Sequence, residues 1–235
     1  GLGDVYKRQR NTQGAAITVN PAEGKTVTIT AYGTNNLTSS GAYAAIQKNG
    51  SGKLVLTSTT KGTINATAGN NATYGAAGIG SQYNMPVDGI RISENADVTA
   101  IGANGAAGIG SGANADAANI EIAGGIVNAT AGSGTIGSKN IGGAGIGSGA
   151  YINDEAKLAS GITISGGTVI ATGGDGGAGI GSGSDVEATE IKVTGGVVKK
   201  ATGGTDAAGV GSGANAKVSD ITISGGTVTA VGGAN

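Results

Sequence analysis

A six-residue phrase, AGIGSG, recurs along this chain and constrains its fold more than any other feature. Three complete copies and two altered or shortened ones occur, at Ala107–Gly112, Ala144–Gly149, Ala178–Gly183, Ala208–Gly213 and Ala77–Ser81. Each copy is followed by an I-x-I triplet and then, usually after a Gly-Gly pair, by V-x-A, as in Ile162–Gly174 and Ile221–Gly233. A unit that recurs in fixed order indicates a repeat architecture in which each copy packs on the next.

The I-x-I triplets indicate seven copies of the unit. Their first residues are Ile17, Leu54, Ile90, Ile120, Ile162, Ile191 and Ile221. In this interpretation Ile17–Val19 and Thr26–Ala31 form the first pair of triplets. The spacing varies because of polar inserts such as 133–142 and 150–160, which fits loops on a fixed frame. One extra residue at Lys199-Lys200 predicts a β-bulge.

Each unit contains short segments in which apolar residues lie two positions apart, which is the period of a β-strand. Frequent glycine and β-branched residues disfavour helix. The sequence therefore predicts an all-β fold, a single-stranded parallel β-helix (β-solenoid). We expect three short strands per coil and about 30 residues per coil plus loop inserts. Each strand should pair with its equivalent about 4.8 Å away, and the Gly-Gly pairs should form corners with positive φ.

The two ends of the chain differ from the repeats. Gly1–Gln9 matches nothing downstream and resembles translated adapter sequence from metagenomic assembly, so we expect an artefactual or disordered segment there. Residues 10–235 should form one β-solenoid domain. The chain stops at Asn235, where another AGIGSG would begin, so we expect the domain to be truncated there and also at its N-terminal end.

Composition argues against several classes of function. The net charge is −1 and charged residues make up 12% of the chain, so no basic stripe exists for nucleic acid. The chain has no cysteine for a disulfide or thiolate site, and no apolar run approaches the ~18 residues of a membrane helix. The glycine-rich phrases lack the GK[ST] of a P-loop and the strand–helix context of a dinucleotide site, so we expect no cofactor.

Acidic residues give little reason to expect a metal or a catalytic site. Asp175 and Asp206 lie in glycine-rich turns, but no carboxylate column recurs from coil to coil, so we expect solvated turns and no calcium. The chain has no histidine. Arg91 and Glu121 should neighbour each other across adjacent coils as a surface pair worth under ~1 kcal/mol. We therefore expect no catalytic residues, and a polysaccharide-degrading β-helix enzyme is a less favoured alternative.

Aromatic and acidic residues in the inserts are the candidate ligand-binding positions. Tyr83 and Tyr151 each follow a GIG phrase by a few residues, and Asp154 and Glu155 share the insert of Tyr151. Exposed aromatic rings could stack on sugars, and loops often carry function. Tyr43 and Tyr74 precede the corresponding isoleucines. An ice-binding threonine face is a further, less favoured alternative, because the outward threonines are irregular and lysines interrupt them.

The AGIGSG and ITISGGTVTAVGG phrases, over Ile17–Asn235, resemble the glycine-rich repeats of bacterial cell-surface proteins, which are described as carbohydrate-binding-domain or adhesin-like β-helix proteins. The resemblance implies secretion, surface attachment and contact with glycans. We therefore expect a non-enzymatic structural or adhesive repeat region, extracellular or on the bacterial surface. Host or cell-wall glycans or other surface proteins would be its partners, and a carbohydrate-binding module is the alternative. Open solenoid ends should also favour end-to-end association.

Overall fold

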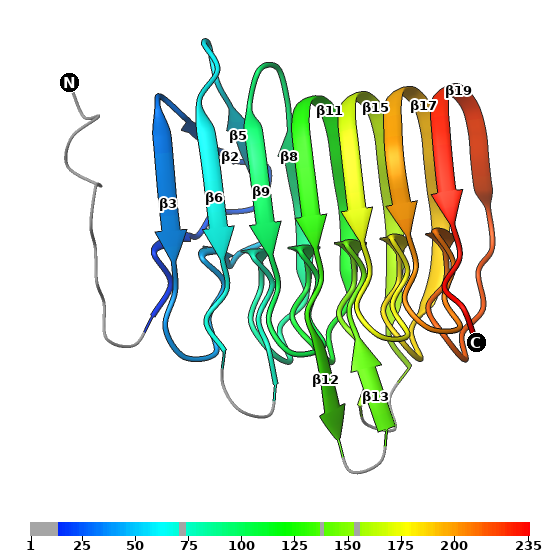
Figure 1. Cartoon of the computed structure of the whole chain (residues 1–235). Helices are drawn as coiled ribbons and strands as arrows, with labels where there is room; N and C mark the ends of the chain where they lie inside the picture. Colours follow the sequence, from blue (N-terminus) through cyan, green and yellow to red (C-terminus); the bar gives the residue numbers. More distant parts are fainter. Residues whose placement is uncertain (1–13, 71–73, 137–138, 153–155) are drawn as a thin grey trace.

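The chain winds into a rod of seven stacked coils in the computed structural model, which describes residues 14–70, 74–136, 139–152 and 156–235 (Figure 1). The described residues contain strands, turns and loops, with no helix long and apolar enough to cross a membrane. The predicted all-β parallel solenoid is confirmed. Gly1–Gln9 lies outside the described residues.

The first strand of each coil belongs to a seven-stranded parallel sheet. Its members, in order, are β1 (Ile17–Val19), β4 (Ile46–Lys48), β7 (Ile79–Gly80), β10 (Ile109–Gly110), β14 (Ile146–Gly147), β16 (Ile180–Gly181) and β18 (Val210–Gly211). From β7 to β16 each strand is the I-G of the AGIGSG phrase, and β18 is the V-G of its altered copy. Isoleucine therefore stacks on isoleucine, as Ile79 pairs with Ile109 and Ile109 with Ile146.

The second and third strands of each coil form the other large sheet. In coils 1–3 they are separate: β2 (Thr26–Thr30), β5 (Lys53–Thr57) and β8 (Val87–Ile92), then β3 (Thr34–Thr38), β6 (Thr63–Thr67) and β9 (Asp97–Ile101). In coils 4–7 they are continuous: β11 (Ala117–Thr130), β15 (Leu158–Thr172), β17 (Glu187–Thr202) and β19 (Ile221–Val231). Three separate strands per coil, as predicted, thus occur only in the first three coils.

The Gly-Gly pairs explain why the later strands run on without a break. Gly125, Gly167, Gly196 and Gly226 have φ between 73° and 78°, values that L-residues with a side chain seldom adopt. The chain reverses over these glycines in a short arch at one side of the rod (Figure 1). The predicted corners with positive φ are confirmed.

The interior is a set of aliphatic columns. The isoleucines and leucines of the second strands face the valines and alanines of the third strands, and both sets are buried, as with Ile162, Ile164, Val169 and Ala171. Successive side chains of each strand point alternately into the interior and outward, so apolar residues two positions apart all face the interior. Alanine at the last inward position keeps the interior narrow, which allows the two faces to approach closely.

The second glycine of AGIGSG is required by the stacking itself. Gly80, Gly110, Gly147, Gly181 and Gly211 have φ between 137° and 142°. A Cβ atom on Gly147 would overlap the carbonyl oxygen of Gly181 in the next coil, and Gly110 meets Gly147 in the same way. A side chain at this position is excluded both by the backbone conformation and by the neighbouring coil.

The serine of the phrase links the coils through its hydroxyl group. Ser111 Oγ donates to the carbonyl of Ala115 at 2.7 Å and accepts from the backbone N–H of Gly149, in the next coil, at 3.0 Å. Ser81, Ser148 and Ser182 accept in the same way from Gly112, Gly183 and Gly213. These serines are buried, so each one satisfies backbone groups that water cannot reach.

The assignment of the first coil from the sequence was wrong by one strand. Ile17–Val19 pairs with Ile46–Lys48, so it is the first strand of coil 1 and not its I-x-I strand. Val27 and Ile29 of β2 instead pair with Leu54 and Leu56. β3, which the triplet pattern did not indicate, pairs with β6 as the third strand. The error arose because register is set by the partner one coil away, and the first coil lacks the glycines that mark the phrase.

The bulge predicted at Lys199-Lys200 is confirmed. Val169 pairs with Val198 and the next residue, Ile170, pairs with Lys200, so Lys199 has no register partner in β15. The extra residue leaves Ala201 aligned with Ala171. The same residues of the strand therefore point into the interior on both sides of the bulge.

Candidate functional site

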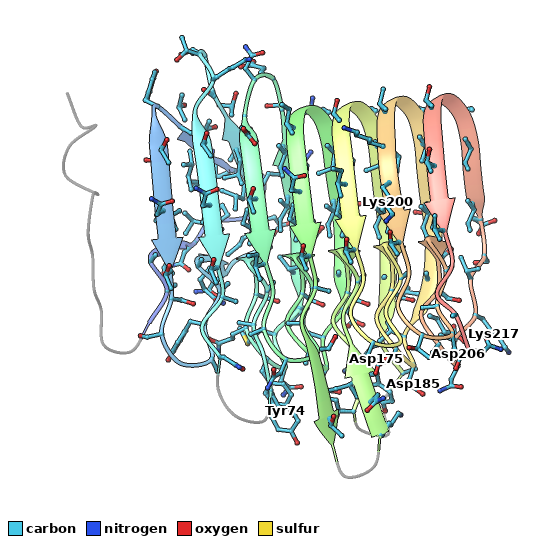
Figure 2. All side chains as sticks on the ribbon, viewed as in Figure 1. Tyr74, Asp175, Asp185, Lys200, Asp206 and Lys217 are labelled. Atoms are coloured by element: carbon cyan, nitrogen blue, oxygen red, sulfur yellow. The ribbon has the colours of Figure 1, made fainter. Side chains whose placement is uncertain are left out.

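One long edge of the rod collects the inserts and most of the polar side chains that depart from the repeat. We call this the insert edge: the corners on either side of the first strands, residues 74–84, 103–115, 133–136, 139–152, 174–185 and 204–217. Tyr74, Asp175, Asp185, Asp206 and Lys217 all lie along it, whereas Lys200 lies away from it on the sheet (Figure 2). It also bears the antiparallel hairpin of β12 (Ser133–Ile136) and β13 (Lys139–Gly142). Loops that project from a rigid frame are the natural place to look for a site.

Tyr74 and Tyr83 form a stacked aromatic pair at this edge. Tyr74 precedes β7 and Tyr83 follows it, so the short strand brings both side chains to one corner. Their ring centroids are 4.2 Å apart and the ring planes differ by 10°. Both side chains are half-exposed. Tyr83, a predicted candidate, therefore has one ring face covered by Tyr74, and the pair together forms a small aromatic platform open to solvent.

Tyr151, the second predicted tyrosine, takes a place in a polar column. In coils 3, 4, 6 and 7 this position holds Asn84, Asn114, Asp185 and Asn215, all with φ between 58° and 62°, a conformation that Asn and Asp tolerate better than other side chains. Asn114 Nδ2 donates to Asn84 Oδ1 at 3.0 Å, so side chains of adjacent coils are linked. Tyr151 and Tyr83 lie two coils apart, and the structure does not bring them together.

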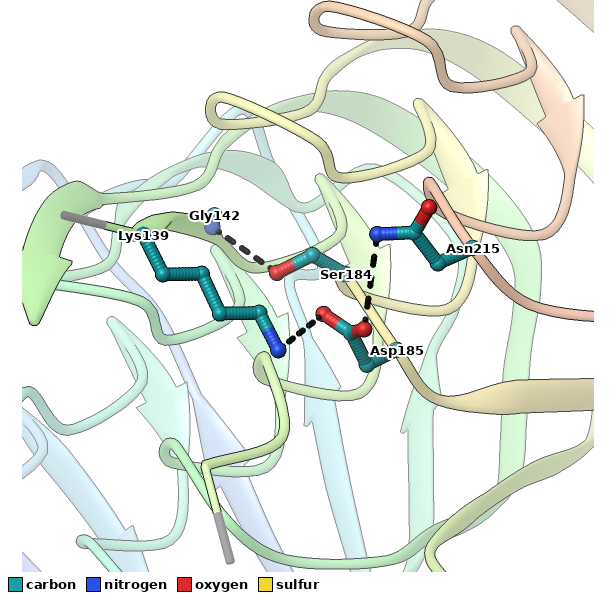
Figure 3. Close-up of polar contacts among 5 residues, drawn as sticks. All are labelled: Lys139, Gly142, Ser184, Asp185 and Asn215. Atoms are coloured by element: carbon teal, nitrogen blue, oxygen red, sulfur yellow. Dashed lines mark hydrogen bonds and ion pairs between the residues drawn. The ribbon is translucent and has the colours of Figure 1, made fainter.

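The hairpin is fastened to coil 6 (Figure 3). Lys139 Nζ lies 3.0 Å from Asp185 Oδ2, and the backbone N–H of Gly142 donates to Ser184 Oγ at 3.3 Å. Asn215 Nδ2 donates to Asp185 Oδ1 at 3.5 Å from coil 7. The Lys139 side chain is half-exposed, so this ion pair is worth ~1 kcal/mol or less. The cluster therefore holds an insert in place and offers no chemistry that needs a desolvated charge.

The described acidic residues of the glycine-rich turns, Asp175 and Asp206, do not converge on a common site. Asp175 uses its backbone N–H to donate to Ser133 Oγ at 2.9 Å, which anchors the hairpin from the other side. Asp206 is an exposed turn residue with φ 57°. Asp154 and Glu155 lie outside the described residues. Within the described part of the chain, no group of three or more His, Cys, Asp or Glu side chains is placed to hold a metal ion.

The cross-coil pair of Arg91 and Glu121 is confirmed. The two residues are register partners in β8 and β11, and their side chains form an ion pair. Ser165 Oγ of the following coil donates to Glu121 Oε1 at 3.3 Å. Both charged side chains are well exposed, so the contact is a surface pair of small energetic value.

The outward face of the third strands is irregular. Asn65 Nδ2 donates to Asn36 Oδ1 at 2.8 Å, the start of a side-chain ladder. Ile101 and Ile126 then interrupt the polar columns, and Lys200 interrupts them again beyond the bulge. A flat, regular threonine array, which an ice-binding face would need, does not form here.

Lys48 is a buried cation that the sequence interpretation overlooked. It occupies the position of the phrase serine in coil 2, and its Nζ donates to the carbonyl of Gly50 at 2.8 Å. Burial lowers the pKa of Lys48, and the negative charge of Asp88 partly offsets this effect. Aligning Ala44–Asn49 with AGIGSG would have revealed the substitution.

Comparison with known families agrees with this architecture. A family model described as "Beta helix repeat" matches residues 90–113, 162–184 and 221–235. The chain contains a β-helix repeat region. Each matched β-helix repeat begins at the first isoleucine of an I-x-I triplet, which lies within the second strand of coils 3 and 5 and at its start in coil 7. Comparisons with curated proteins and with solved structures found no match.

Proposed function

We propose that this β-helix repeat region is a non-enzymatic structural or adhesive part of a secreted or surface-anchored bacterial protein, where it acts as a stiff stalk. The observation that supports this most is the unbroken stacking of seven coils, each joined to the next by parallel strand ladders and, from coil 3 to coil 7, also by the serine contacts of the AGIGSG corners. Seven coils at about 4.8 Å each give a rod of roughly 34 Å.

The distribution of polar groups supports a structural role. The ion pairs of Arg91 with Glu121 and of Lys139 with Asp185 join adjacent coils and fasten an insert. An acid or base for glycoside hydrolysis or elimination would need carboxylates or other titratable groups placed together on one face. The polar contacts described above instead hold the coils and the β12–β13 hairpin together.

A second candidate function, carbohydrate binding, is favoured by one observation, the Tyr74–Tyr83 pair. Two parallel rings on the outer edge of a rigid coil present a preformed aromatic surface. Aromatic side chains combine apolar area with a polar hydroxyl, which suits the faces and edges of a sugar ring. The platform would contact a glycan that lies along the insert edge, with the exposed amide of Asn84 next to it.

A panel of glycans and plant, bacterial and host polysaccharides separates these functions. We would test retention and depolymerisation with the wild-type chain, a Tyr74→Ala/Tyr83→Ala double variant, and Tyr32→Ala as the control. Tyr32 is 60% exposed in coil 1, away from the insert edge. The structural proposal expects no depolymerisation and no difference among the three proteins, each first shown to be folded by circular dichroism.

Two other outcomes change the assignment. Retention of one glycan class that survives Tyr32→Ala but is lost in the double variant would establish carbohydrate binding at the tyrosine pair. Depolymerisation of any polysaccharide by the wild-type chain would overturn the non-enzymatic proposal.

A further inference from the structure

The outward residues of the third strands form a side of the rod that carries little charge. We call this side the third-strand face: the outward residues of 34–38, 63–67, 97–101, 126–130, 168–172, 197–202 and 227–231. These segments all lie in the described part of the chain, and their only charged residues are Asp97 in coil 3 and Lys199 and Lys200 in coil 6. On the opposite sheet surface, in contrast, Arg91 and Glu121 already pair with each other. The charges of the third-strand face are instead three coils apart and have opposite signs at its two ends.

Aliphatic side chains lie between these charges. Ile126 in coil 4 is 46% exposed, and Ile101 in coil 3 and Val197 in coil 6 are each 41% exposed. Threonine occupies the same register positions in neighbouring coils, since Thr168 pairs with both Ile126 and Val197, and Thr130 pairs with Ile101. The frame thus accepts threonine at these positions, and the aliphatic residues add apolar area to an outer face.

We propose that the third-strand face binds the third-strand face of a second copy of this chain, with the two rods side by side and pointing in opposite directions. The argument is charge complementarity. A two-fold axis parallel to the strands, between coils 4 and 5, places coil 3 of each copy opposite coil 6 of the other. Asp97 of each copy then approaches Lys199 and Lys200 of the other. The contact is isologous, so it closes at a dimer.

The same charges disfavour a dimer in which the rods point in one direction. A two-fold axis along the rod keeps coil 6 opposite coil 6, so the lysines of the two copies would face each other. Like charges placed opposite each other weaken association and exclude such arrangements. The distribution of charge therefore selects the antiparallel arrangement of the two rods.

The register shows which uncharged side chains would meet in the antiparallel dimer. Coil 4 of one copy lies opposite coil 5 of the other, so Ile126 lies over Thr168 and Ile170 lies over Asn128. Two sheets packed face to face lie about 10 Å apart, which lets such side chains touch. Burial of the aliphatic area would supply the affinity, and the charges would set the orientation. The interface uses the sides of interior coils, so it does not depend on either end of the rod.

Sedimentation velocity over a concentration series tests this inference with two charge-reversed variants. One is Asp97→Lys, and the other is the double variant Lys199→Glu/Lys200→Glu. Ile126→Lys is a further variant in the apolar middle of the face. The matched control is Lys192→Glu, because Lys192 is an exposed lysine of coil 6 on the opposite sheet surface. Circular dichroism and thermal melting establish that each variant is folded.

We expect the wild type and Lys192→Glu to form dimers. Each charge-reversed variant alone should have its dimer dissociation constant raised by about 100-fold or more, because it opposes like charges at both ends of the interface. Ile126→Lys should also lose the dimer. An equal mixture of the two charge-reversed variants should dimerise again, since lysine at 97 then meets glutamate at 199 and 200 while the native charges meet at the other end.

Three results would overturn the proposal. The first is a wild type that stays monomeric at every concentration. The second is association that the charge-reversed variants and Lys192→Glu alter equally, which would place the contact elsewhere on the rod. The third is a mixture of the charge-reversed variants that remains monomeric, which would rule out the antiparallel two-fold arrangement.

Discussion

Gly147→Ala is expected to lower the free energy of unfolding by about 2–5 kcal/mol, a large part of the 5–15 kcal/mol typical of a folded domain. Gly147 has φ 138°, and a Cβ atom there would overlap the carbonyl oxygen of Gly181 in the next coil. Neither atom belongs to a flexible side chain, so the two coils would have to separate. Separation would also weaken the pairing of Ile146 with Ile180.

Gly24→Ala is the matched control for this effect. Gly24 also has positive φ, at 67°, but a Cβ atom there would meet nothing within 4 Å. Gly24→Ala should therefore lower the free energy of unfolding only by the cost of placing alanine at positive φ, about 1–2 kcal/mol. Urea denaturation of both variants followed by circular dichroism gives the comparison. Equal losses of stability in the two variants would show that the second glycine of AGIGSG is not needed for close stacking of coils.

Ser111→Ala is expected to lower the free energy of unfolding by about 2–4 kcal/mol, because it leaves two buried backbone groups without a partner. The hydroxyl now donates to the carbonyl of Ala115 and accepts from the N–H of Gly149 in the next coil, and Ser111 is fully buried. Alanine fits the space but cannot bond either group. Hydrogen exchange should show Gly149 N–H losing protection more than amides of coils 1 and 2.

Ser212→Ala supplies the control within the same motif. Ser212 Oγ donates to the carbonyl of Ala216 at 3.0 Å in coil 7, which has no coil above it, and the residue is half-exposed. The expected cost is about 1 kcal/mol, the value of one ordinary hydrogen bond. If both substitutions cost the same, the serine hydroxyl does not link the coils.

The repeat could be predicted from the sequence because its physical causes are local and recur. Ile162 and Ile164 two positions apart indicate a strand with one buried face, and Gly166-Gly167 marks the reversal after it. The same logic located the bulge at Lys199 and the neighbours Arg91 and Glu121. In each case the residue types alone limit the backbone to one arrangement.

The first coil and the tyrosine pair depend on information that the triplet pattern does not contain. Ile17-Thr18-Val19 fits the I-x-I pattern, but its hydrogen-bond partner is Ile46, which lies in a segment without the phrase glycines. Tyr74 and Tyr83 meet only because the strand between them places both at one corner. Register and side-chain stacking of this kind are decided by the neighbouring coil, not by the local sequence.

Disulfide formation between introduced cysteines tests whether equivalent residues of successive coils are in-register neighbours. The chain has no cysteine, so introduced pairs report unambiguously. Thr163→Cys with Lys192→Cys joins register partners in adjacent coils, and Thr163→Cys with Thr222→Cys skips one coil. Adjacent positions about 4.8 Å apart can form a disulfide, but positions about 10 Å apart cannot. Under mild oxidation we expect an intramolecular disulfide in the first pair alone. A disulfide in the second pair, or in neither, would show that the coils are not stacked in this register.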